Sequence, residues 1–307
     1  MIDAPTSRRR RGRSAFSRAA EGVFTRLIAL SGLTAIVVLA GITVFLVLNS
    51  WRAITDIGMI EMITGTDWFP TSKVPSYGFL PAETGSMWVT AVAVLLCVPV
   101  GVAAAVYISE FAGRRMKEFT KSVIEFMAAV PSVVLGLIGL ALVVPRVRVW
   151  FELDTGLTAF TAGIVVGIMA LPTIISISED ALHAVPADLR TGSLALGNTR
   201  WQTVYKVVLP AASSGVFAAV MLGVGRAIGE TMVVLMLAGN SGIIADTPFV
   251  SVRTMPGTIA GEMAEVVQGG EHYSVLFAMA LVLFAVTFAI NLAADIVLER
   301  QRRRWRR

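Results

Sequence analysis

The chain has 307 residues, of which 55% are hydrophobic and 15% are charged, and its mean hydropathy is +0.74. A soluble domain carries about 25% charged residues, so this composition excludes an ordinary soluble enzyme, a disordered protein and a basic nucleic-acid-binding domain. The single cysteine, Cys97, excludes a disulfide framework and a cysteine-ligated zinc or iron–sulfur site. The two histidines, His183 and His272, lie far apart in the sequence, which argues against a histidine-ligated metal site.

Six apolar stretches, each almost free of charge, are long enough to cross a bilayer, which takes about 20 residues. They cover 27–48, 86–108, 122–144, 157–178, 211–239 and 274–294. The alternative, a set of buried helices in a large soluble protein, does not suit six such stretches in 307 residues. The first stretch exceeds the roughly 7–15 apolar residues of a signal peptide, and no A-x-A-like site follows it, so we expect a retained anchor. The sequence therefore predicts an all-α polytopic membrane protein with six transmembrane helices.

Basic residues are distributed unevenly among the segments between these stretches. With the N-terminus in the cytoplasm, the inside segments hold 20 Lys and Arg residues, the outside segments hold five, and Arg226 lies within a stretch. This follows the positive-inside rule and predicts a multi-pass protein of the cell membrane with both termini in the cytoplasm. We expect the basic tails to lie against anionic lipid headgroups. Nucleic acid is not an expected partner, because no aromatic platform accompanies the arginines.

The predicted organisation has five parts in chain order. They are a basic cytoplasmic tail (1–26), the first transmembrane helix (27–50), an extracytoplasmic segment (51–85), a five-helix core that includes a cytoplasmic loop (86–298, loop 179–210), and a second basic tail (299–307). The extracytoplasmic segment is rich in Trp and Tyr, which favour the membrane interface. We therefore expect it to lie along the membrane surface.

Glycines and a proline within the apolar stretches predict close packing and a bend. Gly163 and Gly167 are four residues apart in the fourth stretch, and Gly225 and Gly229 repeat that spacing in the fifth. Such pairs let two helices approach closely. Pro131, near the middle of the third stretch, is expected to kink its helix because it removes a backbone donor.

The loop 179–210 predicts two short helices. The first, 188–196, is stopped by Gly197, a residue typical of helix C-termini, and the second, 201–208, ends at Pro210. Two interpretations fit this pattern: an element that docks a cytoplasmic partner by inserting helices into a groove, or a loop that only covers the bundle. The residues predicted for docking are Leu189, Leu194, Leu196, Gly197, Trp201, Leu209 and Pro210.

The same loop resembles that of ABC importer permeases, whose signature is Glu-Ala-Ala followed by a glycine and, further on, by Leu-Pro. Here Gly197 and Leu209-Pro210 match the signature, and Thr191-Gly192-Ser193 occupies the Glu-Ala-Ala position. The segments 130–140, 176–182, 185–212 and 225–240 are similar to phosphate importer permeases. The RAIGETM sequence, followed by AGN, resembles the PstC type more than the PstA type.

This resemblance implies a bundle of the type I ABC importer permease kind, with a cytoplasmic coupling-helix loop, and a phosphate importer as the function. It also implies four partners: a second permease subunit of the PstA type, two ATPase subunits and an extracytoplasmic phosphate-binding protein. The chain has no G-x-x-x-x-G-K-[ST] motif. We therefore expect a transport subunit rather than an enzyme, with no catalytic residue, metal or cofactor of its own, whose partner ATPases use ATP and Mg.

Arg226 and Glu230 are charged residues within the fifth stretch. A charge inside the membrane is costly and is by default a functional candidate. The alternative is a structural ion pair, but apolar side chains would fix the packing without that cost. Because residues four apart share a helix face, we expect an ion pair in which Arg226 offers phosphate a fork of donors and Glu230 weakens the binding enough for transit. The resemblance supports both residues, because the family's charged pair maps onto them.

Glu179 and Asp180 lie at the start of the loop, at the predicted cytoplasmic exit. They are expected either to cap the loop or to hold the docking helices. Three other functions remain as alternatives: a permease for another oxyanion (molybdate, sulfate or phosphonate), an ion-coupled secondary transporter that needs no ATP, and a membrane enzyme or sensor. The secondary transporter leaves the 179–210 loop unexplained, and no nucleophile–base or metal constellation lies in the apolar stretches to support an enzyme.

Overall fold

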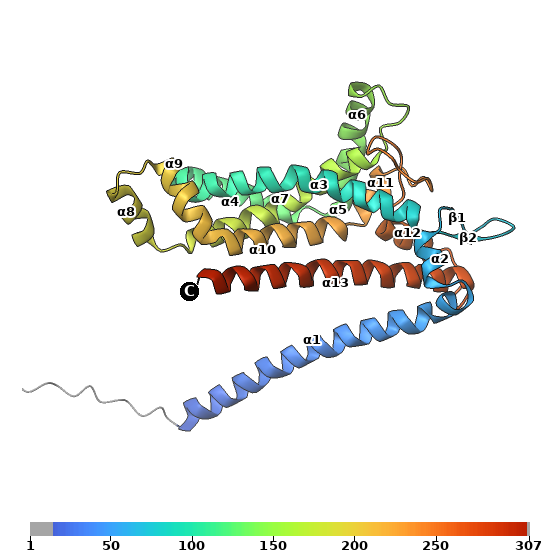
Figure 1. The fold of residues 1–307 in the computed structure, drawn as a ribbon, viewed down its shortest axis with the longest axis horizontal. Helices are drawn as coiled ribbons and strands as arrows, with labels where there is room; N and C mark the ends of the chain where they lie inside the picture. The colour runs from blue at the N-terminus through green and yellow to red at the C-terminus, as the bar shows by residue number, and fades with distance from the viewer. Residues whose placement is uncertain (1–14, 306–307) are drawn as a thin grey trace, which may run out of the picture. The chain divides into compact units, whose positions relative to one another are not determined.

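The computed structural model describes residues 15–305, with side chains from 24 to 299. Most side chains of the tails predicted at 1–26 and 299–307 therefore lie outside the described residues, while the backbone of 15–26 and 299–305 is helical. Figure 1 shows a helical protein with one short strand pair. The helices are α1 (Ala15–Asp56), α2 (Met59–Thr64), α3 (Leu80–Val106), α4 (Arg114–Ala129), α5 (Ser132–Ile138), α6 (Val144–Trp150), α7 (Ala159–His183), α8 (Ala187–Ala195), α9 (Arg200–Thr203), α10 (Leu209–Ile228), α11 (Met232–Leu237), α12 (Met255–Glu262) and α13 (Glu271–Trp305). The remaining elements are the strands β1 (Trp68–Phe69) and β2 (Ser76–Tyr77) and the π-helical turns η1 (Tyr107–Phe111), η2 (Gly139–Val143) and η3 (Val204–Val208).

The chain forms two compact units, residues 1–48 and 49–307. In the first unit, α1 exposes large apolar side chains around its circumference, among them Leu30, Ile36 and Val38. A helix that is hydrophobic all round requires either a protein core or lipid around it. This part of α1 therefore has the surface of a membrane-spanning helix.

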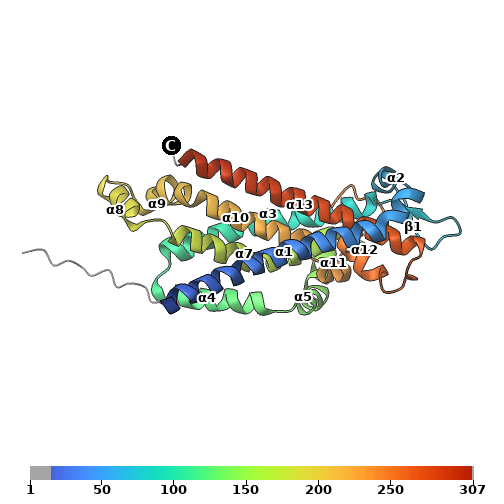
Figure 2. The same cartoon turned by 90° about the horizontal axis from the view of Figure 1, so that it is seen from below.

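The second unit is built around α7, which packs against α3 along one side and against α10 along another. Figures 1 and 2 show these three helices running alongside one another, and α13 packs against α10 and α12. Close packing is possible because α7 carries small residues where α3 approaches. A Cβ atom added at Gly163 would lie 2.6 Å from Cβ of Val92, and one at Gly167 would lie 3.0 Å from the carbonyl oxygen of Ala93. The close approach predicted at Gly163 and Gly167 is confirmed.

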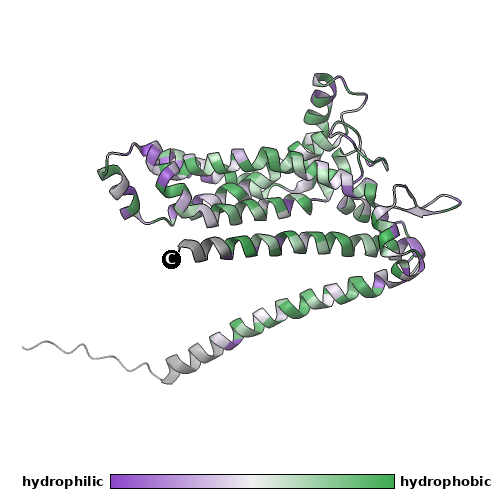
Figure 3. Cartoon of the chain, in the orientation of Figure 1, coloured by the Kyte–Doolittle hydropathy of each residue, from purple (hydrophilic) through white to green (hydrophobic). Residues whose placement is uncertain are grey.

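Six helical segments of the described chain are long and apolar enough to cross a membrane, judged by length and composition. They are Phe24–Asp56, Leu80–Phe111, Ser132–Trp150, Ala159–His183, Arg200–Ile228 and Glu271–Glu299. Figure 3 shows hydrophobic residues along α3, α10 and α13, and hydrophilic residues gathered around α8 and α9. The number of spans predicted from the sequence is confirmed.

The third span is displaced from its predicted position, 122–144. Residues 114–129 form a separate helix, α4, in which no residue is buried, and the membrane-length segment begins at Ser132. Val130 and Pro131 adopt extended backbone between α4 and α5, because a residue before proline is pushed away from the helical region. Pro131 therefore separates two helices instead of kinking one.

The segment 51–85 is partly packed into the protein and partly exposed, with Trp51, Phe69 and Val74 among its exposed side chains. β1 and β2 pair antiparallel, with Trp68 opposite Tyr77. Met62, Trp68 and Phe79 are buried in one hydrophobic cluster with residues of α12 and α13. The aromatic residues of the segment therefore divide between this core and the surface, where Trp51 and Phe69 are exposed. We call this region, residues 59–79 with α12 and the start of α13, the hairpin end.

Candidate functional site: a broken span and a connecting loop

The fifth apolar stretch, 211–239, is divided between two helices, and the break lies at the end of the membrane-length segment Arg200–Ile228. α10 ends at Ile228, with Gly229 as its cap, and α11 begins only at Met232. Glu230 lies in the break, and its Oε1 accepts a hydrogen bond from the backbone N–H of Val233 at 3.3 Å. The carboxylate thus satisfies a donor that the first turn of α11 leaves unpaired, and its negative charge suits that end of a helix.

Arg226 occupies the last turn of α10, just before this break. Its side chain is exposed, and its Nη1 donates a hydrogen bond to Oγ1 of Thr173, on α7, at 3.4 Å. The ion pairs of the described residues do not include one between Arg226 and Glu230. The structure does not form the predicted pair, because residues four apart share a face only on a continuous helix, and this helix ends at Gly229.

The guanidinium of Arg226 therefore contacts a neutral hydroxyl group, which does not compensate its charge. A guanidinium has five N–H donors in a fixed fork, so it can bind an oxyanion through two parallel hydrogen bonds. Thr173 was not identified from the sequence: it follows Pro172 in an apolar stretch, and no motif marks it. The break thus presents a cation, a hydroxyl group and, on its other side, a carboxylate that caps α11.

The loop between α7 and α10 exposes apolar side chains, as the docking interpretation predicts. Leu189 and Leu194 on α8 are 46% and 45% exposed, Leu196 is 86% exposed, and Trp201 on α9 is 60% exposed. Gly197 has a φ of +85°, a left-handed conformation in which glycine is favoured after a helix. The first predicted helix and its stop at Gly197 are confirmed. Among the described residues, its outer face is exposed.

The second predicted helix does not end at Pro210. Leu209 and Pro210 are half-buried and stand in the first turn of α10, and α9, η3 and α10 form one span from residue 200 to 228. In η3 the N–H of Leu209 bonds to the carbonyl of Val204, five residues back. The π-helical turn accommodates the proline, since its missing N–H costs nothing in the first turn of the next helical segment.

Short polar side chains join α8 to α9. Oγ of Ser193 and Oγ1 of Thr203 form a buried hydrogen bond of 3.0 Å, and Nδ2 of Asn198 donates to Oγ of Ser193 at 3.1 Å. Thr199 begins α9 with a reciprocal capping box, in which Gln202 is its partner. The loop is therefore an ordered pair of helices.

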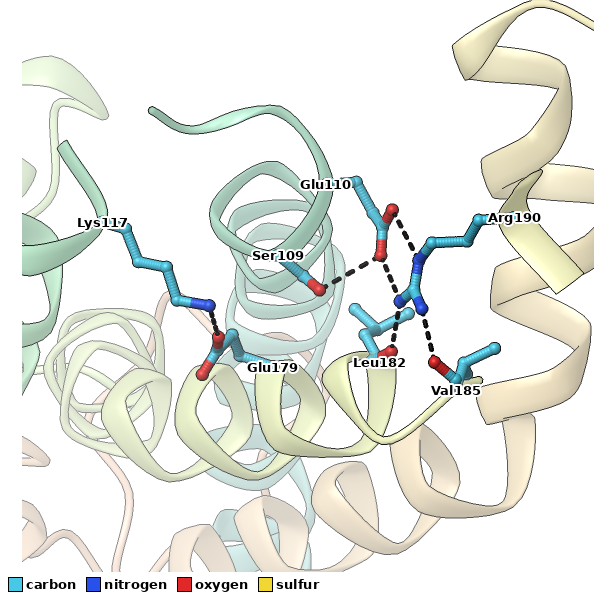
Figure 4. A network of polar contacts seen from close by, with 7 residues as sticks. All are labelled: Ser109, Glu110, Lys117, Glu179, Leu182, Val185 and Arg190. Carbon is cyan, nitrogen blue, oxygen red and sulfur yellow. Dashed lines mark hydrogen bonds and ion pairs between the residues drawn. The ribbon is translucent and has the colours of Figure 1, made fainter. Parts of the chain in front are cut away.

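Arg190 ties α8 to the rest of the loop region, as Figure 4 shows. Its Nε and Nη2 donate to the two carboxylate oxygens of Glu110, in η1, at 3.3 and 2.8 Å. Its Nη2 also donates to the carbonyl of Leu182 at 2.7 Å, and its Nη1 donates to the carbonyl of Val185. Sequence reasoning missed this contact, because Glu110 and Arg190 are 80 residues apart and each resembles an ordinary charge at the edge of an apolar stretch.

Glu179 has a different role from the one predicted. Its carboxylate is 3% exposed and forms ion pairs with Lys117 at 2.6 Å and with Lys121 at 2.9 Å, both on α4. Figure 4 shows the Lys117 contact beside the Arg190 network. The hydrogen bond to Glu179 raises the pKa of Lys121. Glu179 therefore joins α4 to α7, while Arg190 holds the docking loop, and Asp180 is exposed. We call residues 107–121 and 179–209 together the loop end.

A third polar cluster lies at the hairpin end. Glu262 accepts hydrogen bonds from Nε1 of Trp68 at 3.1 Å and from Nη1 of Arg253, and it contacts Nε2 of His272 at 2.9 Å. Burial opposes the charged form of Glu262, but the hydrogen bonds of His272, Arg253 and Trp68 outweigh it and lower the pKa of this carboxyl group. These four residues also line a cavity of about 410 Å³. The described residues contain no group of three or more His, Cys, Asp and Glu side chains arranged to hold a metal ion.

Comparisons of sequence place residues 97–307 in the family described as "Binding-protein-dependent transport system inner membrane component". The chain is 39% identical over 235 residues to a probable ABC transporter permease protein, YqgH, of Bacillus subtilis, with 76% of each chain covered. It is 30% identical over 299 residues to the phosphate transport system permease protein PstC of Mesorhizobium japonicum, covering 91% of this chain and 90% of that protein.

Comparisons of structure agree on the fold. A chain of a bacterial alginate ABC transporter, solved with its pentasaccharide-bound periplasmic protein, matches with a TM-score of 0.63 at 13% identity and covers 92% of this chain and 96% of that one. A chain of the MetNI methionine ABC transporter in an inward-facing conformation matches with a TM-score of 0.54 at 20% identity, covering 73% and 94%. The chain therefore belongs to the family of binding-protein-dependent transport system inner membrane components, and it is a multi-pass membrane transport subunit with the ABC importer permease fold.

Proposed function

We propose that this chain is the permease subunit, of the PstC type, of an ATP-driven importer of inorganic phosphate. The observation that carries the proposal is the guanidinium of Arg226, which stands at the break of a membrane-spanning helix with a hydroxyl group, not a carboxylate, as its partner. A cation in the last turn of a membrane-length helix is costly wherever hydrocarbon surrounds it. Binding of a transported oxyanion would explain why an arginine occupies this position, whereas helix packing needs no charge there.

In this mechanism phosphate accepts hydrogen bonds from the fork of Arg226 donors while Thr173 holds the side chain between transport events. Glu230 limits the affinity, because its negative charge lies in the break after α10 and repels an oxyanion. The break between α10 and α11 gives the backbone a place to bend while the bundle alternates its opening. Together these residues bind phosphate firmly enough to select it and weakly enough to release it.

The loop end faces the cytoplasm in this proposal, with both chain termini on the same side. The exposed leucines of α8, with Trp201, dock on an ATPase subunit. Two such ATPase subunits bind the ATP and Mg, so this chain binds no cofactor itself. A second permease of the PstA type completes the path, an extracytoplasmic phosphate-binding protein delivers phosphate at the hairpin end, and the basic tails lie on anionic lipid headgroups.

The test is uptake of radioactive phosphate by vesicles that contain the whole complex, with and without ATP. We expect uptake to depend on ATP, to fall strongly in Arg226→Gln and to fall less in Arg226→Lys, which keeps the charge but loses the fork. Arg114→Gln, which removes an exposed cation from α4, is the matched control.

The same assay separates the alternatives. If molybdate, sulfate or phosphonate inhibits the uptake at a lower concentration than unlabelled phosphate does, the chain belongs to an importer of that other oxyanion. Uptake that proceeds without ATP and follows an ion gradient would assign it to the secondary transporters. Normal ATP-driven phosphate uptake by fully assembled Arg226→Gln complexes would refute the role of the guanidinium.

A further inference from the structure

The docking helix α8 is attached to the membrane-spanning helices in two different ways. Its backbone packs against α9 and η3, which continue into α10, and no comparable packing joins it to α3 or α7. The side chain of Arg190 on α8 bonds to Glu110 in η1, which continues α3, and to the carbonyl of Leu182 in α7. A force applied to the outer face of α8 reaches α10 through α9 and η3. It reaches the ends of α3 and α7 through the Arg190 contacts and through the short connection 184–186.

We propose that Arg190 is a positioning residue that makes α8 move as one body with the ends of α3 and α7, so that ATP hydrolysis in a docked partner is converted into transport. This inference rests on the proposed function, because it assumes that α8 is the docking helix. It assigns to Arg190 and Glu110 a step that Arg226 does not perform, namely coupling.

The geometry of Arg190 suits a rigid link. The pair with Glu110 uses both carboxylate oxygens, and such a fork fixes orientation as well as distance. The two side chains are only 23% and 11% exposed, so water competes weakly for them. Oγ of Ser109 donates a further hydrogen bond to Oε1 of Glu110 at 3.2 Å and so holds the carboxylate in place.

The same guanidinium also binds the C-terminal end of α7. The carbonyls of Leu182 and Val185, which accept from Arg190, lie at or just after the last turn of that helix, where carbonyl groups lack helical donors and the helix dipole is negative. Arg190 is therefore shared by three elements. Lysine in its place could not bind the carboxylate and both carbonyls with the same fixed geometry.

Glu179 makes a useful contrast within the loop end. It joins α4 to α7 and thus connects two helices of the bundle, whereas the Arg190 network connects the bundle to the docking element. Loss of the Glu179 pairs should loosen the bundle. Loss of the Arg190 pair should leave the bundle and the exposed leucines of α8 intact and should disturb only the link between them.

The test measures phosphate uptake and ATP hydrolysis in the same vesicles, with the complete complex reconstituted. For Arg190→Gln and for Glu110→Gln we expect normal co-purification of the ATPase and continued hydrolysis, with the phosphate transported per ATP reduced about tenfold. The double variant should show the same ratio as either single variant, because both remove one shared contact. Arg190→Lys should give an intermediate ratio, and Arg114→Gln, whose ion pair on α4 is exposed, should leave the ratio unchanged.

A chemical cross-link between positions 110 and 190 provides the most decisive experiment. In Glu110→Cys/Arg190→Cys, a flexible reagent that joins two thiols should restore the ratio, whereas each single cysteine variant should not respond. The native Cys97 is fully buried and should not react. A low ratio after complete cross-linking, an unchanged ratio in the glutamine variants, or failure of these variants to assemble would each overturn the proposal, the last because it would assign the pair to folding. Absence of ATP-driven phosphate uptake by the wild-type complex would instead refute the proposed function.

Discussion

The loop end and the last turn of α10 each contain an arginine whose side chain contacts another element. Arg190 at the loop end binds a carboxylate and two carbonyl groups, whereas Arg226 at the break donates to a single hydroxyl group. A guanidinium whose charge is compensated within the chain stabilises a fixed geometry. One whose charge is not compensated is available to a ligand, and this difference leads us to assign coupling to Arg190 and phosphate binding to Arg226.

The substitution Arg226→Gln removes the arginine whose charge no carboxylate compensates, and we expect it to have the largest effect on transport. Loss of the cation that binds the transported oxyanion should lower ATP-driven phosphate uptake about a hundredfold. Uptake by reconstituted complexes measures it, and Arg226→Lys should retain part of the activity. Equal activity of wild type and Arg226→Gln would remove the reason for distinguishing the two arginines.

Gly163→Leu tests the close packing of α3 against α7, the two helices whose ends Arg190 connects to α8. Its side chain would enter space held by Val92, because even a Cβ atom would lie 2.6 Å from Cβ of that residue. We expect the free energy of unfolding to fall by about 2 kcal/mol, measured by thermal denaturation in detergent. Gly192→Leu, on the exposed α8 with no atom within 4 Å of the added Cβ, is the matched control, and an equal effect of both would contradict the packing argument.

Leu196→Glu tests the outer face of the loop end. This side chain is 86% exposed, so the change should not disturb folding, but a charge in an apolar contact should weaken ATPase binding about tenfold. Binding of the purified ATPase to the permease pair measures the loss. Unchanged affinity would favour the interpretation of the loop as a mere cover.

Glu262→Gln tests charge compensation at the hairpin end, where Arg253, His272 and Trp68 surround a carboxylate. Because the pKa of Glu262 is lowered in the folded protein, its charge stabilises the fold above the ordinary carboxyl pKa, and this contribution is lost as the pH falls through the lowered value. We expect wild type to exceed Glu262→Gln by about 1 kcal/mol at neutral pH, with the difference shrinking in acid. Thermal denaturation of both proteins across this pH range measures it, and a difference that grows in acid would contradict the assigned direction.

Arg114→Gln should have the smallest effect. The ion pair of Arg114 with Glu118 has side chains that are 92% and 66% exposed, and such pairs contribute less than about 0.5 kcal/mol on a helix. Thermal stability, uptake and coupling should all match wild type. A large loss would show that compensation by a carboxylate is not what distinguishes these arginines.

Much of this architecture was predictable from the sequence, for physical reasons that particular residues make clear. Long apolar stretches find membrane spans because burial in lipid depends on composition. Gly197 marked a helix end and Gly163 marked a close helix contact, since each pattern has a local cause. Thus the number of spans, an exposed short helix between α7 and α10, and one helix interface followed from local sequence.

The parts that were not predictable depend on backbone geometry or on distant contacts. Hydropathy does not register a helix break, so the sequence predicts one helix kinked at Pro131 in the third stretch and one helix running through Gly229 in the fifth, where the structure has two helices in each case. The predicted pairing of Arg226 with Glu230 depended on that continuity. The contacts of Arg190 and of Glu179 join residues far apart in the sequence, and a single sequence contains no signal for such pairs.

The most direct test of the central claim restores a positive charge at position 226 by chemistry. In Arg226→Cys, a thiol reagent that adds a cationic group should return a substantial part of ATP-driven phosphate uptake, whereas a neutral reagent of the same size should not. The buried Cys97 is left in place as a shared background. Equal responses to the two reagents, or full uptake by the unmodified variant, would contradict the claim that phosphate binds this cation on its way through the membrane.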